Sequence, residues 1–329
     1  MHFTERHPEI RRVGSQKFVY TKTRKPVPES ICETIRSLRI PKDYHTLWVS
    51  PNPEQDSLQA IALDSQGRKQ YFYSADWIYY RNAEKIKRMY KFALRLPRLE
   101  QRMMHDICSL PTFHKYRVIA FMLRIVQLTN IRIGNKKYYD RYKSHGLCTL
   151  QKHQVRLGRH VAFINFIGKH HQEHDIVIRE ESVVNFLKNL LRINSTTDEN
   201  WLFVFQQDNN TNQFFQVSAQ MVNDYLHLDP ELAEITCKDF RTLNANIVFL
   251  KLLRDKPIDT TNDSKLLARN VRQTIEDTSR HLNNSANVCK QSYIMDVVVD
   301  MYMNDPGFVQ RKFIIDILKQ AVKKAGKKK

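Results

Sequence analysis

Residues 58–73 read Leu-Gln-Ala-Ile-Ala-Leu-Asp-Ser-Gln-Gly-Arg-Lys-Gln-Tyr-Phe-Tyr, and this stretch decides how the first part of the chain folds. Its two ends belong to the extended runs Leu58–Leu63 and Lys69–Ser74. The tetrad Asp64-Ser-Gln-Gly67 between them is a turn signal. The segment is therefore predicted to form a β-hairpin.

The surrounding residues predict a small β domain. Further extended runs occur at Phe18–Thr21 and Thr46–Val49. Six of the eleven prolines precede residue 82, which disfavours long helices there. Residues 1–81 are therefore predicted to form a mainly β N-terminal domain.

From Asn82 onward the pattern of apolar residues becomes helical. Apolar residues recur at helical spacing from Ile86 to Leu94 and from Val183 to Leu191. Ser218 and Ser264 are predicted helix N-caps. Residues 82–329 are thus predicted to form a larger, mostly helical domain.

One β segment interrupts the helical domain. Val161–Ile167, Gly168-Lys169 and Asp175–Ile178 read as strand, turn and strand. The predicted fold class is therefore α+β.

The charge of the chain points to a partner. Its 329 residues carry 53 Lys+Arg against 34 Asp+Glu, a net charge of +19, and 42% are hydrophobic, enough for a packed core. Clustered basic residues gain affinity for nucleic acid by releasing phosphate counterions. Nucleic acid is the first partner to consider, and a basic protein whose charge only keeps it dissolved is the alternative. The lysine tail Lys323–Lys329 is read as a solvated end, with weak DNA contact as the alternative.

Other sequence features bear on location. The five cysteines are scattered and include no Cys-x-x-Cys pair, which fits reduced thiols and argues against a zinc site or disulfide framework. The apolar stretch Val118–Val126 contains Arg124 and is far shorter than the ~20 residues of a membrane span. The N-terminus lacks the apolar region of a signal peptide. We therefore expect an intracellular protein, in the cytoplasm or with DNA.

The residues available for phosphodiester chemistry are cationic. Carboxylates are scattered, and no cluster for divalent metal ions is visible. Chemistry without a metal needs a nucleophile, cations and a general acid. Arg132, Lys169, Arg241 and Tyr293 are candidates of these types.

Five blocks, in order along the chain, carry a family resemblance. Residues 58–73 are similar to an "LQA…D–GRKQYxY" hairpin. Arg132-Ile-Gly-Asn135 and Tyr138, followed by Gly146-Leu-Cys-Thr-Leu150, are similar to "RIGN…Y…GLxTL".

The remaining blocks follow downstream. They are Phe166–Lys169 ("FxGK"), Ile235–Thr242 ("ITxKDFRT") and Leu282–Ile294 ("LGNTPxVCRKSYI"). Together the blocks resemble the type IB DNA topoisomerases of the short class found in poxviruses, other large DNA viruses and some bacteria.

The resemblance implies a mechanism. Tyr293 would attack a DNA phosphate and form a 3′-phosphotyrosyl link. Arg132 and Arg241 would stabilise the transition state, and Lys169 would protonate the leaving 5′ oxygen. Religation would reverse the reaction, and no cofactor, ATP or metal would be required. Relaxation of supercoiled DNA by a monomer in which two domains clamp the duplex is the expected activity. In a viral source the enzyme would be found in virions and host cytoplasm.

A fifth catalytic position departs from one version of the pattern. Poxvirus members have histidine nine residues before the tyrosine, and here that position is Asn284. Its amide can donate a hydrogen bond to a phosphate oxygen but cannot become cationic. His281 is the alternative. The residues Asn283–Ala286 also replace the usual "GNTP".

The resemblance further implies DNA contacts. Gln70, Tyr71 and Tyr73 match hairpin residues that enter the major groove, and Tyr138 and Lys238 match phosphate contacts. Each of these residues also has a purely structural interpretation. The hairpin side chains would be cross-strand neighbours, and Tyr293 would be a buried aromatic residue. Arg132 and Arg241 would each be half of an ion pair, and Lys169 would be a solvated lysine in a turn.

Three further alternatives concern function. His170, His171 and His174 lie in a polar turn without a cysteine, and a metal site is not predicted there. A tyrosine recombinase shares the Arg–Lys–Arg–Tyr chemistry but typically carries His-x-x-Arg where this chain has Lys238-Asp-Phe-Arg241. A DNA-packaging protein would use the charge alone.

Overall fold

A computed structural model describes residues 3–14, 17–52, 54–193, 200–207, 213–258 and 263–326. The chain divides into two compact units, Met1–Lys85 and Ile86–Lys329. The first contains a sheet and the second is mostly helical, so the α+β class is confirmed. Within the described ranges, no helix is long and apolar enough to cross a membrane.

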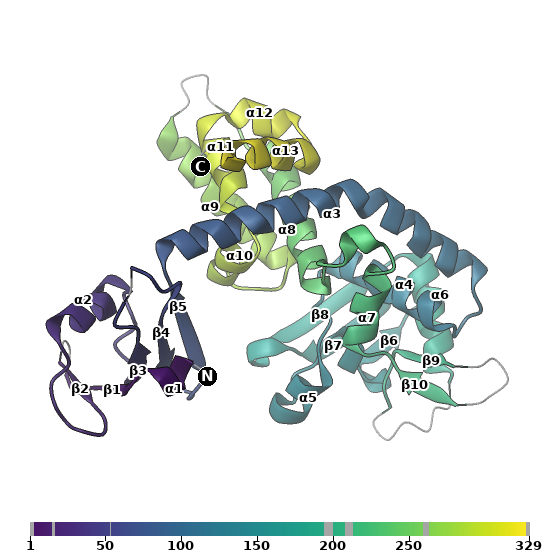
Figure 1. The fold of residues 1–329 in the computed structure, drawn as a ribbon. Helices are drawn as coiled ribbons and strands as arrows, with labels where there is room; N and C mark the ends of the chain where they lie inside the picture. The colour runs from purple at the N-terminus through teal and green to yellow at the C-terminus, as the bar shows by residue number, and fades with distance from the viewer. Residues whose placement is uncertain are drawn as a thin grey trace. The chain divides into compact units, whose positions relative to one another are not determined.

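The first unit is built on a five-stranded antiparallel sheet of order β2-β1-β3-β4-β5 (Figure 1). Its core contains the buried Ile10, Leu47, Ala60 and Ala62. All four predicted extended runs form strands, whereas β1, which lies between β2 and β3, was not predicted. The elements are α1 (Phe3–Arg6), β1 (Glu9–Arg12), β2 (Phe18–Tyr20), α2 (Glu29–Ser37), β3 (Thr46–Val49), β4 (Leu58–Leu63) and β5 (Lys69–Tyr73).

The long helix α3 (Ala75–Ser109) begins seven residues before the predicted change at Asn82. Its first turn is capped by Ser74, whose Oγ accepts from Trp77 N at 3.2 Å. Pro97 lies inside it. The predicted domain boundary after residue 81 therefore falls within a helix.

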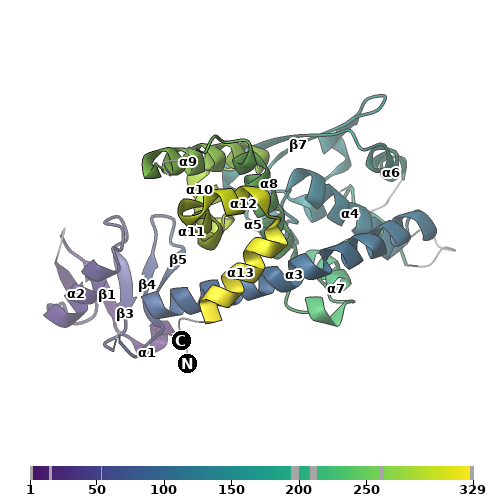
Figure 2. The same ribbon diagram turned by 90° about the horizontal axis from the view of Figure 1, so that it is seen from above.

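The second unit has α4 (Lys115–Thr129) at its centre, with Val118–Leu123 buried throughout. This helix packs against α6, α7 and α8 (Figure 2). The other helices of this unit are α5 (Lys136–Tyr142), α6 (Glu181–Leu191), α7 (Ala219–Leu226), α8 (Cys237–Arg254), α9 (Ser264–His281), α10 (Ala286–Ser292), α11 (Asp296–Asn304), α12 (Pro306–Arg311) and α13 (Ile314–Gly326).

Two of these helices test the predicted N-caps. Ser218 caps α7 and accepts from Met221 N, as predicted. The prediction for Ser264 is wrong by one residue, because the Asp263 carboxylate caps α9 and accepts from Lys265 N. Carboxylate and hydroxyl oxygens are both good caps, so composition alone did not fix the position. Residues 327–329 of the lysine tail lie outside the described residues.

The predicted strand–turn–strand segment is confirmed as β7 (Ala162–Ile167) and β8 (Glu173–Ile178), which pair from Ala162↔Ile178 to Ile167↔Glu173. With β6 (Val155–Leu157) they form an antiparallel sheet of order β6-β7-β8. The tip of the β7–β8 hairpin is the short 3-10 helix η3 (Lys169–His171). A separate pair joins β9 (Val204–Gln206) to β10 (Phe214–Gln216). The remaining short 3-10 helices are η1 (Leu147–Thr149), η2 (Lys152–Gln154) and η4 (Pro230–Leu232).

Candidate active site

Arg132 lies in the loop after α4, and two glycines hold this loop against a second segment. A Cβ at Gly134 would lie 2.7 Å from Gly146 Cα, and a Cβ at Gly146 would lie 2.5 Å from Gly134 Cα. Leu147 N donates to Arg132 O at 2.8 Å. Because only glycine permits this close backbone approach, Gly134 and Gly146 fix the backbone position of the loop that carries Arg132.

Arg241 lies on α8 and is only 3% exposed. Its Nη2 donates to Leu282 O at 2.8 Å, and its Cζ lies 4.8 Å from the centre of the Tyr293 ring. Burial lowers the pKa of Arg241 to about 10; the Arg132 charge adds to this, while Tyr293 opposes it. The guanidinium therefore remains charged at neutral pH while lying against the predicted nucleophile.

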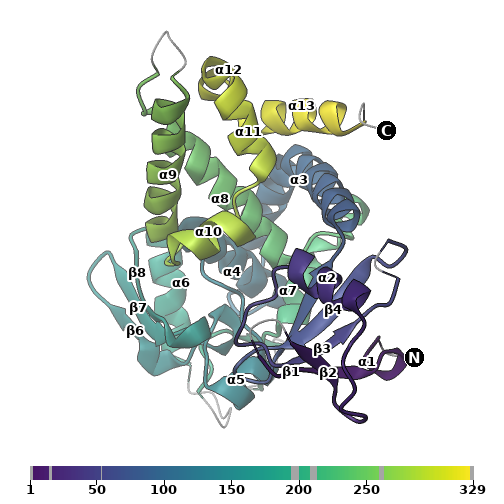
Figure 3. The ribbon, with the colours of Figure 1, turned by 90° about the vertical axis from the view of Figure 1, so that its left-hand side faces the viewer.

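Tyr293 follows α10 and is 6% exposed. Its backbone is held by Asn246, a fully buried residue of α8. Asn246 Nδ2 donates to Tyr293 O at 2.9 Å, and Asn246 Oδ1 accepts from Met295 N at 3.1 Å. One helix thus supplies both the cation beside the Tyr293 ring and the amide that fixes its main chain. Helix α9 packs against α8 and α10 (Figure 3).

Asn284 lies between α9 and α10 and contacts the other arginine. Its Oδ1 accepts from Arg132 Nη2 at 2.8 Å. The alternative candidate, His281, is exposed at the end of α9. The geometry brings Asn284 to Arg132, and its catalytic role stays a prediction.

Three donors at this site have no protein partner among the described residues. They are Asn284 Nδ2, Arg241 Nε and Arg241 Nη1, and all are buried. A buried donor left unsatisfied costs about 1–3 kcal/mol. Donors of this kind, carried by side chains that contact Arg132 and Tyr293, are suited to bind the oxygens of a tetrahedral anion.

Lys169 is the exposed member of the predicted set. It begins η3 at the tip of the β7–β8 hairpin. Later in the same hairpin, His174 is buried at 4% exposure. Burial, assisted by the charges of Arg132 and Arg241, lowers the pKa of His174 to about 4, against the opposing effect of Asp175. The hairpin therefore places a neutral imidazole near the two arginines.

The three predicted hairpin contacts with DNA belong to the first unit and do not share one face of β5. Tyr71 and Tyr73 are 52% and 37% exposed, and alternation along the strand puts them on the same face. Gln70 points the other way, and its Nε2 donates to Asp64 Oδ2 at 2.9 Å. The exposed pair is free to contact a ligand, whereas Gln70 stabilises the turn in this structure.

The two predicted phosphate contacts are both exposed helix residues. Tyr138 of α5 is 60% exposed and stacks on Tyr142 with ring centres 6.0 Å apart. Lys238 lies in the first turn of α8, three residues before Arg241. The role of each stays a prediction.

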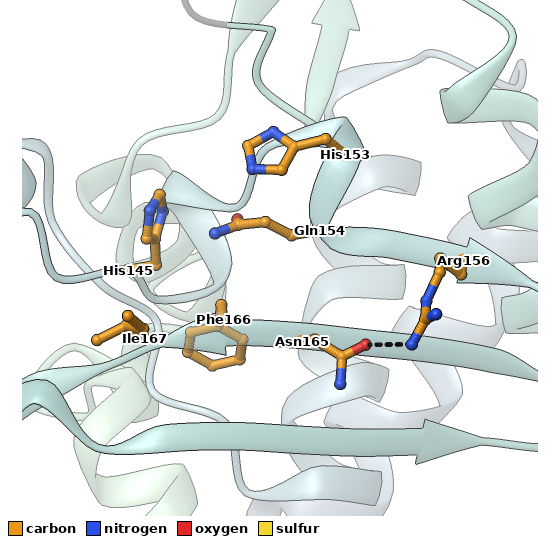
Figure 4. A pocket seen from close by; sticks show the side chains of 7 residues that line it. All are labelled: His145, His153, Gln154, Arg156, Asn165, Phe166 and Ile167. Atoms are coloured by element: carbon orange, nitrogen blue, oxygen red, sulfur yellow. Dashed lines mark hydrogen bonds between the residues drawn. The ribbon is translucent and has the colours of Figure 1, made fainter.

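Within the described part of the chain, no three His, Cys, Asp or Glu side chains form a group that could hold a metal. The side chain of His170 lies outside the described ones. A hollow of about 390 Å³ beside β6 and β7 contains none of the predicted catalytic residues (Figure 4). It is lined by His145, His153, Gln154, Arg156, Asn165, Phe166 and Ile167.

Sequence reasoning missed the roles of Asn246, Asn283 and His174. Each of them contacts residues that are distant in the chain. Asn246 and Tyr293, for example, are bonded although they are 47 residues apart. The one available signal was Asn283, which stands where the family pattern has glycine. A residue that replaces glycine at a left-handed position, here with φ 48°, invites the question of what its side chain contacts.

Known proteins resemble the chain over most of its length. A model of the family described as eukaryotic DNA topoisomerase I, catalytic core, matches residues 69–305, which include all five predicted catalytic residues. The DNA topoisomerase 1B of Acanthamoeba polyphaga mimivirus is 32% identical over 319 residues, 94% of each chain. The DNA topoisomerase 1B of vaccinia virus (strain Copenhagen) is 23% identical over 288 residues, 84% of this chain and 83% of the relative. The chain therefore belongs to the family of type IB DNA topoisomerases.

Proposed function

We propose that the protein relaxes supercoiled DNA by cutting and rejoining one strand through a covalent bond to Tyr293. The observation that carries this proposal is the set of buried, unpartnered donors of Arg241 and Asn284 beside Tyr293 and Arg132. A phosphodiester is an anion that such donors can bind from several sides.

In the proposed reaction Tyr293 Oη loses its proton to solvent and attacks phosphorus, so that a new P–O bond forms and the P–O5′ bond breaks. A free phenol with pKa ~10 is only about 0.1% ionised at pH 7. The reaction therefore needs positive charge beside the nucleophile, and the Arg241 guanidinium lies 4.8 Å from the centre of the Tyr293 ring. It also offers two free donors to the developing charge on the phosphate.

Arg132 and Asn284 would act as a pair. Asn284 Oδ1 is occupied by Arg132, which leaves Nδ2 as the donor for a non-bridging oxygen. Lys169 would give its proton to the leaving O5′. In religation the 5′ hydroxyl attacks the phosphotyrosine and returns that proton.

The proposed reaction needs neither ATP nor a metal. One phosphate ester replaces another, so the bond energy is retained. The two guanidinium groups supply the positive charge that divalent ions supply in metal-dependent nucleases. We also propose that the enzyme acts as a monomer on double-stranded DNA.

Relaxation of supercoiled plasmid in EDTA without ATP tests the proposal. The wild type should relax the plasmid and form a covalent protein–DNA adduct, and Tyr293→Phe should do neither while still binding DNA. Tyr302→Phe is the matched control, because Tyr302 is fully buried and its hydroxyl accepts a hydrogen bond from Asn270 Nδ2 at 3.1 Å, away from the candidate site. A wild type that needs a metal, or an active Tyr293→Phe variant, would contradict the proposal.

A further inference from the structure

Three consecutive residues between α9 and α10 contact three different elements of the candidate site. Leu282 O accepts from Arg241 of α8, and Asn284 Oδ1 accepts from Arg132 of the loop after α4, each at 2.8 Å. The residue between them, Asn283, contacts the β7–β8 hairpin that bears Lys169. The segment Leu282–Asn284 thus joins both arginines to that hairpin.

The Asn283 side chain makes its bonds just beyond the tip of the hairpin. Its Nδ2 lies 2.9 Å from Glu173 O and 2.9 Å from His174 Nδ1, and its Oδ1 accepts from Gln172 Nε2 at 3.3 Å. These three partners follow Lys169 by three to five residues. A glycine at this position, as in the family pattern, would make none of these bonds.

The hairpin side of this contact is itself closely packed. The His174 ring stacks on Phe166 with centres 4.6 Å apart and planes at 1°. A Cβ at Gly168 would lie only 2.6 Å from His174 Nε2. Gly168 N donates to Gln172 O at 2.8 Å and closes the loop that contains Lys169. A shift of the Asn283 partners would therefore be transmitted to the residue before Lys169.

We infer that Asn283 is a positioning residue for the general acid: its side chain fixes the Lys169 hairpin relative to the segment that holds Arg132 and Arg241. The inference rests on the proposed function, because it takes Lys169 as the proton donor to O5′. His174 can accept the hydrogen bond from Asn283 Nδ2, because a neutral imidazole that accepts at Nδ1 carries its proton on Nε2.

The test compares two leaving groups in single-turnover cleavage. One duplex carries an ordinary 5′ oxygen at a cleavage site mapped on plasmid DNA, and the other carries a 5′ sulfur there. A thiolate leaves without a proton, so loss of a general acid slows only the oxygen substrate. Asn283→Gly removes the side chain, and glycine keeps the left-handed backbone without strain.

We expect Asn283→Gly to slow cleavage of the oxygen substrate about 10- to 100-fold, part of the ~10²–10⁴-fold that general acids contribute. Cleavage of the sulfur substrate should change much less. Lys169→Ala should show the same selectivity with a larger loss. Asn165→Ala is the matched control: it removes a cross-strand bond to Asp175 within the same hairpin but leaves Asn283 intact, so its selectivity should be that of the wild type.

The outcomes separate the two claims. If Lys169→Ala slows both substrates equally, the proposed role of Lys169 is wrong and the inference fails with it. If Lys169→Ala is selective for oxygen but Asn283→Gly is not, or if Asn283→Gly has no effect, the proposed function stands and the inference is overturned. A general loss of folding in Asn283→Gly would slow both substrates alike, and thermal melting would detect it.

Discussion

The β4–β5 hairpin of the first unit and the β7–β8 hairpin of the second each join two antiparallel strands through a tip that contains glycine. In the first, the Asp64 carboxylate accepts from Gln66 N, Arg68 N, Arg68 Nε and Gln70 Nε2, all within six residues. In the second, the side chain that holds the tip is Asn283, more than 100 residues further along the chain.

This difference separates a turn that its own sequence stabilises from one that depends on the rest of the domain. Desolvation raises the pKa of Asp64, but the hydrogen bonds from Arg68 and Gln70 more than compensate and lower it to about 2. The Asp64 carboxylate is therefore ionised at any physiological pH, and the hydrogen bonds that close the turn are retained. The second hairpin takes its position from a segment that also contacts Arg132 and Arg241, which suits the proposed catalytic role of Lys169.

The largest loss of stability and of cleavage rate is expected for Gly168→Ala in the second hairpin. The added methyl group would lie 2.6 Å from His174 Nε2, a ring held between Phe166 and Asn283. Overpacking of this kind costs about 1–3 kcal/mol, and a catalytic group misplaced by about 1 Å can lose roughly 10²-fold in rate. Urea unfolding and single-turnover cleavage measure the two effects. Wild-type cleavage by this variant would show that the hairpin tip tolerates displacement.

The next effect is a dependence of stability on pH that arises from His174. Its pKa is about 4 in the folded protein and ~6.5 when unfolded. Below pH 6.5 the unfolded chain therefore binds a proton that the folded chain excludes, and stability falls until the pH reaches about 4. By proton linkage, about 2 kcal/mol of the free energy of unfolding should be lost between pH 7 and pH 5 through this residue.

Urea unfolding at the two pH values checks this expectation, with His174→Asn to remove the titrating ring. The pH-dependent loss should be smaller in the variant by that amount. The charges that face His174 are those of Arg132, Arg241 and Asp175. An equal loss in both proteins would mean that His174 is solvated and charged.

The smallest effect is expected for Gly67→Ala in the first hairpin. Gly67 has φ 71°, but nothing lies within 4 Å of an added Cβ. The cost is then only the left-handed backbone, about 1–2 kcal/mol. Thermal melting should show this loss, while the single-turnover cleavage rate at saturating enzyme stays that of the wild type. A rate loss as large as that of Gly168→Ala would abolish the distinction between the two hairpins.

The sequence predicted much of the fold where the signal was local. The hairpins at Asp64–Gly67 and Gly168-Lys169 were predicted because turn residues separate β-forming runs. Strand β1 was not, because Glu-Ile-Arg-Arg has no strand pattern and is extended through its pairing with β2 and β3. The start of α3 was placed too late because aromatic residues such as Trp77 and Tyr80 do not mark a helix by composition.

The ordered motifs also identified the family, and with it the recombinase and packaging alternatives are set aside. They named the five predicted catalytic residues, and the structure brings four of them together in two pairs. Arg132 donates to Asn284, and the Arg241 guanidinium lies over the Tyr293 ring. They assigned no role to Asn246 or Asn283, because one sequence does not show which distant group an asparagine side chain will bind.

The sequence alone identified the enzyme family and the residues of the proposed chemistry: a tyrosine, two arginines, a lysine and an amide, in the order of that family, on a strongly basic chain. The residues that hold these groups in place became visible in the folded chain. The reason is physical. Side-chain identity sets what a group can donate, accept or attack, whereas its position depends on contacts between residues far apart in the chain, such as those of Leu282–Asn284 with α8, the loop after α4 and the β7–β8 hairpin.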